Sequence, residues 1–237
     1  MAETDFKELS IHCVTQADFD EVKKFLLADF LYNEPLNKSV SLNAADSDEL
    51  FGDLVNHGIA SSLSYVLRAP GGEIAALRLA AILDRSEEEH QNQHNQASIS
   101  DKNAASDGST TKAKRYCPKA QIIVDILTEL ESKIWTLINP QLKRVLLWSI
   151  ISVQKDYTRR GFAEKLLCYK LDEVRQMGCQ GCVAEASSFK SQLLFKKIGY
   201  EMIHEVRHAE WLDDRGQQIF QCDDSTDSIQ LLFKPLR

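Results

Sequence analysis

A continuous apolar run, VLLWSIISV at 145–153, constrains the fold of this chain more than any other feature. The run is rich in aliphatic and β-branched residues and lacks the alternation of a half-exposed strand, so it predicts a central strand covered on both faces. Such a strand needs a layer of helices on each side. Amphipathic patterns at 18–31, 48–63, 123–137 and 163–177 supply those helices. We therefore predict a mixed α/β sandwich on one sheet, as a single domain over 1–237.

Turn and capping signals place the remaining elements. Pro70, Gly71 and Gly72 separate two strand-like runs and predict a hairpin. Thr15 followed by Asp18 is a capping box, and Gly178 and Gly199 are typical residues just after a helix end. A helix at 188–199 has either Ser187 or Ser188 as its N-cap. The other strands are expected at 9–15, 182–186, 200–211 and 227–236.

One segment departs from this globular pattern. Residues 85–115 contain a single large aliphatic residue, Ile99, among polar and charged ones. Such a segment cannot bury enough apolar surface to offset the entropy lost on ordering. We predict a long disordered insertion from Arg85 to Arg115, with no assigned role.

Charge and cysteine usage limit the partners. A formal net charge of −7 argues against nucleic-acid binding, which needs a concentrated basic face. No run approaches the roughly 20 apolar residues of a membrane span, and the first ten residues lack a secretory pattern, so we expect a cytoplasmic protein without a membrane partner. The six cysteines are expected to be free thiols. Cys179 and Cys182 have no second pair at zinc spacing, so no metal site is expected.

A basic turn, QKDYTRRGFAEK at 154–165, follows the apolar run. The first N–H groups of a helix have no partner within it and carry partial positive charge, which suits a phosphate. Gly161 lets a ligand approach the main chain, and Lys155, Arg159, Arg160 and Lys165 add a local positive field. The turn therefore predicts a diphosphate site, although a basic helix cap that binds nothing is the alternative. The common P-loop and Rossmann glycine motifs are absent from the sequence, which excludes the usual ATPases and dehydrogenases.

The turn resembles the acetyl-CoA diphosphate motif Q/R-x-x-G-x-G/A of the GNAT acetyltransferases, and Thr158 departs from its first position. The resemblance implies a mixed, mostly antiparallel sheet flanked by helices, with acetyl-CoA as cosubstrate. It also implies that the central strand splays from its neighbour, so that Val153 pairs with the pantetheine arm. The residues it assigns to the cofactor are Val153, Thr158, Arg159, Arg160, Gly161, Phe162 and Ala163.

Two further segments resemble the insect and nematode arylalkylamine N-acetyltransferases of the dopamine N-acetyltransferase type. FLYNEPLN at 30–37 is similar to the segment that carries their catalytic glutamate, which is Glu34 here. EASSFKSQ presents Ser187 and Ser191 at the spacing of their two functional serines. The alternatives are that Glu34 only caps the Pro35 turn, that Ser187 is an N-cap, and that Ser191 has no role.

The chemistry of acetyl transfer fits these residues. The attacking amine must lose a proton, and Glu34 is a suitable base if burial raises its pKa. Many GNAT enzymes protonate the leaving thiolate with a tyrosine at the position of Phe195, which cannot donate, so the proton donor stays unidentified. Phe30, Tyr32 and Leu36 flank Glu34 and are candidates for an aromatic amine pocket.

The resemblance implies an N-acetyltransferase that uses acetyl-CoA and acts on arylalkylamines such as dopamine, tyramine, octopamine or serotonin by direct transfer in a ternary complex. Its partner is then a small-molecule amine. Two alternatives stay open: a GNAT acting on a polyamine or a peptide amino terminus, and a non-catalytic module that binds acyl-CoA. Thr158 and Phe195 are the features that favour the second of these.

Overall fold

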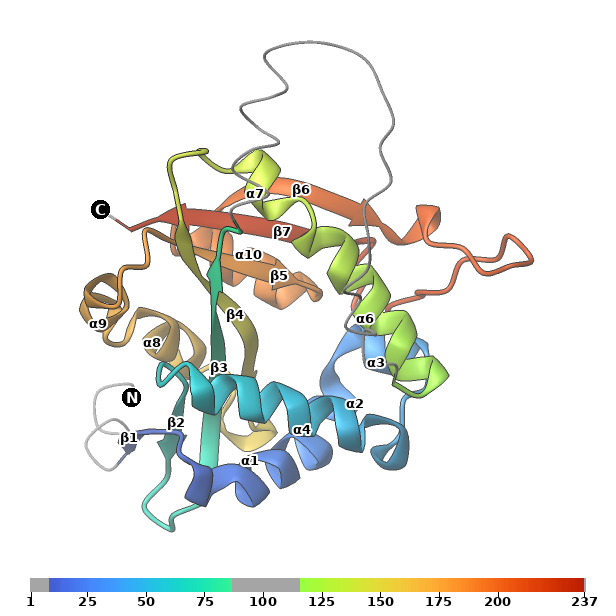
Figure 1. Ribbon diagram of the computed structural model, residues 1–237. Helices are drawn as coiled ribbons and strands as arrows, with labels where there is room; N and C mark the ends of the chain where they lie inside the picture. The colour runs from blue at the N-terminus through green and yellow to red at the C-terminus, as the bar shows by residue number, and fades with distance from the viewer. Residues whose placement is uncertain (1–8, 87–115, 237) are drawn as a thin grey trace, which may run out of the picture.

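A seven-stranded mixed sheet forms the centre of the protein in a computed structural model that describes residues 9–86 and 116–236 (Figure 1). The strand order is β1-β2-β3-β4-β5-β7-β6, and β4 and β5 are the one parallel pair among these described strands. The expected mixed, mostly antiparallel sheet is therefore confirmed. The strands are β1 Ser10–Cys13, β2 Tyr65–Arg68, β3 Ile74–Asp84, β4 Arg144–Val153, β5 Gly181–Ala186, β6 Glu201–Arg207 and β7 Ser228–Pro235.

Helices cover both faces of the sheet (Figure 1). One core cluster packs α1, α4 and α6 against one face, and a second packs α8, α9 and α10 against the other. β4 alternates between them, because Val145 and Leu147 lie in the first cluster and Leu146 and Trp148 in the second. The helices are α1 Phe19–Phe25, α2 Leu31–Asn33, α3 Pro35–Ser39, α4 Ala44–Ala60, α6 Pro118–Glu131, α7 Ile134–Leu137, α8 Phe162–Cys168, α9 Leu171–Gln176 and α10 Phe189–Lys197.

Three predicted helices differ from the observed ones. The first contains a π-helical stretch, Leu26–Phe30, between α1 and α2. The helix expected at 123–137 is divided into α6 and α7, and the one expected at 163–177 is divided into α8 and α9, with Lys170 at φ 55° between them. Apolar periodicity continues across such breaks because both pieces pack on the same sheet face.

The predicted helix ends agree better with the structure. Gly178 and Gly199 adopt φ of 83° and 88°, the left-handed conformation that ends many helices. Ser188 is the N-cap of α10, so the alternative that Ser187 caps this helix is wrong.

The insertion predicted for 85–115 lies outside the described residues except for its first two. Arg85 contradicts the prediction, because it is buried and donates hydrogen bonds to the backbone carbonyls of Trp135, Asn139 and Leu142. Its guanidinium also lies 4.8 Å from the centre of the Trp135 ring. Of these three residues only Trp135 belongs to α7, whose last carbonyls have no partners within the helix and therefore favour a cation.

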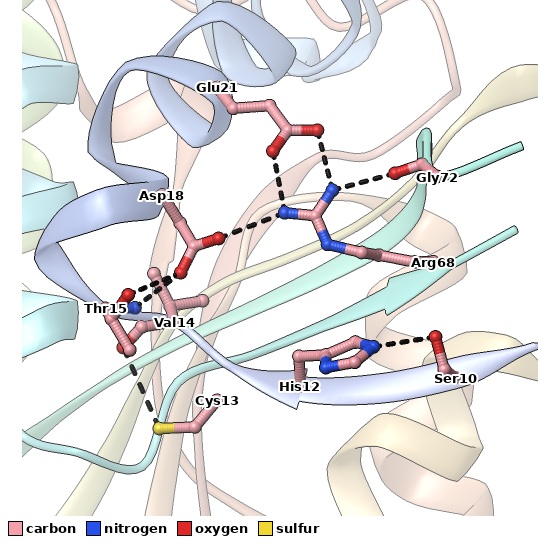
Figure 2. Close-up of polar contacts among 9 residues, drawn as sticks. All are labelled: Ser10, His12, Cys13, Val14, Thr15, Asp18, Glu21, Arg68 and Gly72. Carbon is pink, nitrogen blue, oxygen red and sulfur yellow. Dashed lines mark hydrogen bonds and ion pairs between the residues drawn. The ribbon is translucent and has the colours of Figure 1, made fainter.

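Arg68, at the end of β2, fixes the start of the helical arm that leads to Glu34 (Figure 2). It binds both carboxylate oxygens of Glu21, at 2.7 and 2.6 Å, and also Asp18 and the carbonyl of Gly72. Asp18 in turn accepts the hydrogen bonds of the capping box from Thr15, as predicted. One guanidinium thus joins the β2–β3 hairpin to the first helix.

No helix in the two described ranges has both the length and the apolar character needed to cross a bilayer. All six cysteines are free, as expected.

Candidate active site

β4 and β5 pair over only three positions and then separate. Their register joins Leu146–Trp148 to Cys182–Ala184, whereas β4 continues to Val153 and β5 to Ala186. β4 is bulged at the point of separation, because Leu79 and Ala80 of β3 pair with Ile150 and Trp148 and skip Ser149. A bulge bends a strand and increases its twist. Beyond Trp148, β4 and β5 therefore diverge and form a fork. The backbone groups on the β5-facing edge of β4 are available there to an extended ligand, and Val153 is the last residue of that edge.

The predicted diphosphate turn follows β4 directly. Arg159 and Gly161 adopt left-handed φ of 62° and 78° on either side of Arg160, a backbone form that curls amides into an anion-binding concavity. A Cβ atom added at Gly161 would meet nothing within 4 Å, so this part of the main chain is open. Thr158 and both arginines are exposed. The Phe162 side chain is buried, so only its backbone can serve a ligand, and Ala163 is half-buried.

A buried arginine that the sequence analysis missed holds the other end of the helix after this turn. Arg78 of β3 is fully buried and donates to the carbonyls of Leu166 and Tyr169 at the end of α8, and to that of Leu63. Its guanidinium lies 4.7 and 4.9 Å from the ring centres of Tyr65 and Trp148. Burial lowers the pKa of Arg78 to about 10, so it remains charged at neutral pH. Arg78 thereby fixes α8 on the sheet.

Glu34 lies between α2 and α3, and its two carboxylate oxygens have different surroundings. Its Oε2 accepts the backbone N–H of Asn37 at 2.6 Å, so it caps α3, and Pro35 occupies the first helical position. Its Oε1 is completely covered and makes no hydrogen bond of good geometry with a described residue, although the Ser187 hydroxyl lies near enough to stabilise the charged carboxylate. Burial raises the pKa of Glu34, and the N–H groups of Asn37 and Leu36 and the hydroxyl of Ser187 oppose that shift only in part. Glu34 therefore caps α3 through one carboxylate oxygen, and that contact leaves its other oxygen unused.

The two predicted serines have different surroundings. Ser187 follows β5 directly, is half-buried, and acts on the Glu34 carboxylate from the adjoining strand end. Ser191 belongs to a capping box, in which its hydroxyl lies 2.9 Å from that of Ser188 and donates to the Ser188 carbonyl at 2.8 Å. The structure therefore brings Ser187 to Glu34 and engages Ser191 in the helix cap.

The flanking aromatic candidates lie partly in the core. Phe30 packs on Phe51 with ring centres 5.9 Å apart, and Leu36 is buried in the same cluster. Tyr32 is 57% exposed. Phe195, which replaces the expected tyrosine, is buried against Tyr200.

Several buried polar groups were not predicted. Cys222 has its Sγ 3.7 Å from Nδ1 of buried His208, and burial raises the pKa of this thiol to about 11, with Glu34 adding to the effect. Glu185 of β5 has a covered Oε1 that lacks a partner in the described part of the chain. Cys222 and Glu34 come from distant segments and have no motif spacing, so only the fold reveals their proximity.

A metal centre finds no support in residues 9–86 and 116–236. No group of three or more His, Cys, Asp and Glu side chains there is arranged to hold an ion. Cys179 and Cys182 are buried free thiols, and burial raises the pKa of Cys182 to about 12.

No family model matches the chain, and no curated protein matches it by sequence. Solved structures do match over its length. Arylalkylamine N-acetyltransferase 2 from Aedes aegypti is 21% identical with a TM-score of 0.76, covering 97% of this chain and 99% of its own. Drosophila melanogaster polyamine N-acetyltransferase, which forms N-acetylagmatine, is 20% identical with a TM-score of 0.71, covering 97% and 100%. The NatC complex with Gag peptide and CoA is more distant, at 12% identity and a TM-score of 0.52, covering 97% and 99%.

Proposed function

Because the chain has the fold of the GNAT acetyltransferases, we propose that it is an acetyl-CoA-dependent N-acetyltransferase of small primary amines, and that its amines are arylalkylamines such as dopamine, tyramine, octopamine and serotonin. One observation carries this proposal. The buried carboxylate of Glu34 meets the Ser187 hydroxyl at the end of β5, where the strand fork opens, and its Oε1 makes no hydrogen bond of good geometry with a described residue. A cytoplasmic location is part of the same proposal.

The cosubstrate fits the fork and the turn together. The pantetheine arm would pair with the free edge of β4 as far as Val153, as an added strand does. The diphosphate would bind the amides between Thr158 and Ala163, where Gly161 leaves the main chain open and Arg159 and Arg160 supply positive charge. The NatC structure, which was solved with CoA, is consistent with this use of the fold.

The proposed reaction is a direct transfer in a ternary complex. Glu34 accepts a proton from the ammonium group of the substrate, directly or through a water, and its raised pKa suits it to do so near neutral pH. The neutral amine then attacks the thioester carbonyl carbon, and the carbon–sulfur bond breaks as the new amide forms. The nitrogen loses its second excess proton to solvent as the amide forms, and CoA leaves as a thiolate with a pKa of about 8.5, the value of a comparable thiol. Ser187 lies beside the base, and Ser191 supports the helix that follows.

The amine class rests on the order of the sequence motifs and on the likeness to the Aedes enzyme. A polyamine substrate is the second candidate, because acidic Asp224 acts on the Glu34 carboxylate and the Drosophila enzyme makes N-acetylagmatine. A peptide amino terminus is a third, from the NatC likeness. A non-catalytic acyl-CoA module remains the alternative of a different class, on the grounds of Thr158 and Phe195.

Release of free CoA thiol from acetyl-CoA, measured with a panel of arylalkylamines, polyamines and a short peptide, tests the proposal. Turnover of an arylalkylamine supports it, and turnover of only the other amines moves the assignment to them. Calorimetry with CoA provides the second measurement. CoA binding without turnover favours the non-catalytic module, whereas no CoA binding rejects the transferase.

A further inference from the structure

Asp29 connects two parts of the molecule that are far apart in the sequence. It lies in the π-helical stretch Leu26–Phe30 of the helical arm (residues 19–34), a few residues before Glu34. Its Oδ2 accepts the backbone N–H of Lys155 at 3.1 Å, and Lys155 lies 126 positions later in the basic turn at 154–165. This hydrogen bond therefore ties the arm that carries the proposed base to the turn that is proposed to hold the diphosphate.

The hydrogen bond to Lys155 is a helix cap supplied from another part of the chain. Lys155 is the first residue of a short 3₁₀ helix, Lys155–Tyr157, and the first N–H groups of a helix have no partner within it. Gln154, at the N-cap position, makes no side-chain bond to these groups. A carboxylate suits this place because it accepts strongly and opposes the partial positive charge of a helix start. Asp29 thus replaces a local N-cap residue.

Further hydrogen bonds extend this contact in both directions. The Lys155 carbonyl accepts the hydroxyl of Thr158 at 3.0 Å, and Thr158 is the first residue of the segment proposed to bind the diphosphate. On the arm, the Asn33 side chain donates to Oδ1 of Asp29 and to its main-chain carbonyl, the latter at 2.9 Å. Asn33 directly precedes Glu34. Hydrogen bonds therefore run from the residue before the proposed base to the start of the diphosphate segment.

The backbone of the arm is unusual at the same point. A π-helix is rare in proteins and occurs mostly as a single turn, frequently at functional sites. Here it includes Asp29 and also Phe30, whose carbonyl accepts the N–H of Glu34 at 3.0 Å. One turn of the arm thus holds both the contact to Lys155 and the backbone of Glu34.

We propose that Asp29 is a positioning residue, which fixes the helical arm against the basic turn so that the Glu34 carboxylate is aligned with the thioester of bound acetyl-CoA. This inference rests on the proposed function. Reacting groups must come within about 3–3.5 Å, and a misplacement of about 1 Å can cost 10²-fold in rate. Asp29 acts through Lys155 and Asn33, whose N–H groups occupy its two carboxylate oxygens. Its loss should therefore lower kcat more than it weakens the binding of CoA.

The backbone around Lys155 permits a substitution that removes its N–H. Proline is tolerated at the first position of a helix, and it requires an extended residue before it. Gln154 has φ −55° and ψ 140°, which meets that requirement. Lys155→Pro therefore removes the hydrogen bond to Asp29 without breaking the short helix. Lys155→Ala is the matched control, because it loses the same charge and keeps the N–H.

Release of CoA thiol with an accepted amine tests the role of Asp29. We expect kcat to fall about 10–100-fold in Asp29→Ala relative to the wild type, and by a similar factor in Lys155→Pro relative to Lys155→Ala. The Kd for CoA should change little between the members of each pair. Asp29→Asn keeps an oxygen for the N–H and should recover most of the rate.

The double variant of Asp29→Ala with Lys155→Pro shows whether the two changes remove the same contact. Its kcat should be close to that of the slower single variant, because one hydrogen bond cannot be lost twice. Losses that multiply in the double variant would overturn the role of Asp29. An unchanged kcat in Asp29→Ala would overturn it as well.

Amide hydrogen exchange separates failure of this role from failure of the transferase. In the absence of substrates, Asp29→Ala and Lys155→Pro should both speed exchange at 30–37, whereas Lys155→Ala should match the wild type. Added CoA should slow this exchange in the wild type and not in Asp29→Ala. If the wild type shows these effects and acetylates no amine, the proposed function fails and the connection through Asp29 stands. If turnover is present and exchange at 30–37 is the same in all four proteins, the connection is wrong and the transferase stands.

Discussion

The Gly161 turn and the Glu34 site lie at the ends of β4 and β5, two strands that diverge, yet they are built in opposite ways. The turn is exposed and basic, and it consists of consecutive residues whose backbone conformation arranges the amides for an anion. The Glu34 site is covered and acidic, and its groups come from the start of α3, the end of β5 and the segment between β6 and β7. The proposed anionic cosubstrate and cationic amine would thus have separate surroundings.

The difference has an energetic consequence. Amides that bind an anion carry no net charge and cost little when the turn is empty. Buried carboxylates do cost free energy in the absence of a cation, and they reduce that cost by holding protons. The two regions should therefore respond differently to mutation and to pH.

Glu34→Gln should give the largest effect. Glutamine keeps an oxygen that can cap α3, so the fold and the binding of acetyl-CoA should persist. Loss of the base should lower kcat by about 10²–10⁴-fold, measured as thiol release. Glu201→Gln, at an exposed acid of β6, serves as the control. Unchanged turnover in Glu34→Gln would remove this residue as the base.

The two buried arginines allow a matched comparison. Arg78 holds the helix that follows the Gly161 turn, whereas Arg85 binds backbone carbonyls away from that turn. Arg78→Met should lower the free energy of unfolding by about 3 kcal/mol, because it leaves three carbonyls without their charged donor. It should also raise the Kd for CoA, since α8 loses its anchor. Arg85→Met removes equivalent contacts far from the turn and should lower stability alone. Equal effects of the two variants on CoA affinity would contradict a positioning role for Arg78.

Gly161→Ala tests the backbone of the turn directly. At φ 78° a side chain costs about 1–2 kcal/mol in stability. The added methyl group would enter the open space that the diphosphate is proposed to occupy, so CoA affinity should fall as well. Gly216→Ala, at φ 74° with equally open surroundings, is the control for strain without a ligand effect. Calorimetry with CoA distinguishes the two contributions.

The smallest effect concerns pH and stability. Because the folded-state pKa of Glu185 lies above its usual value of 4.5, its contribution to stability is complete below about that pH and is lost as the pH rises through the folded pKa. Glu185→Gln should therefore be more stable than the wild type at pH 8 by about 1 kcal/mol, or 2–4 °C in Tm, with little difference at pH 4.5. Thermal unfolding at both values measures this. If Glu185→Gln is less stable than the wild type at pH 8, the prediction is wrong, because the ionised Glu185 carboxylate must then make a stabilising contact.

The two regions also differ in how far the sequence predicts them. The central strand, the hairpin, the Thr15 capping box and the left-handed Gly178 and Gly199 follow from local patterns, and the structure confirms them. The observed fork agrees with the splay that the family resemblance implied, and the predicted fold is confirmed.

Contacts between residues that are far apart in the sequence could not be predicted from local patterns. Arg78 interrupts an apolar strand pattern and gives no sign that it reaches the end of α8, some 90 residues later. Asp29 and Lys155 belong to the helical arm and to the turn after β4, and neither has a spacing that relates it to the other. The roles of Ser187, Ser191 and the cofactor residues stay predictions, because the fold positions them but shows no bound ligand's chemistry.

A crystal structure with CoA and an unreactive amine tests the central claim most directly. We predict that the diphosphate lies on the amides around Gly161, that the thiol lies in the fork beyond Trp148 and Ala184, and that the amine nitrogen lies within hydrogen-bond reach of Glu34. CoA bound away from the fork, or an amine bound out of reach of Glu34, would contradict the account.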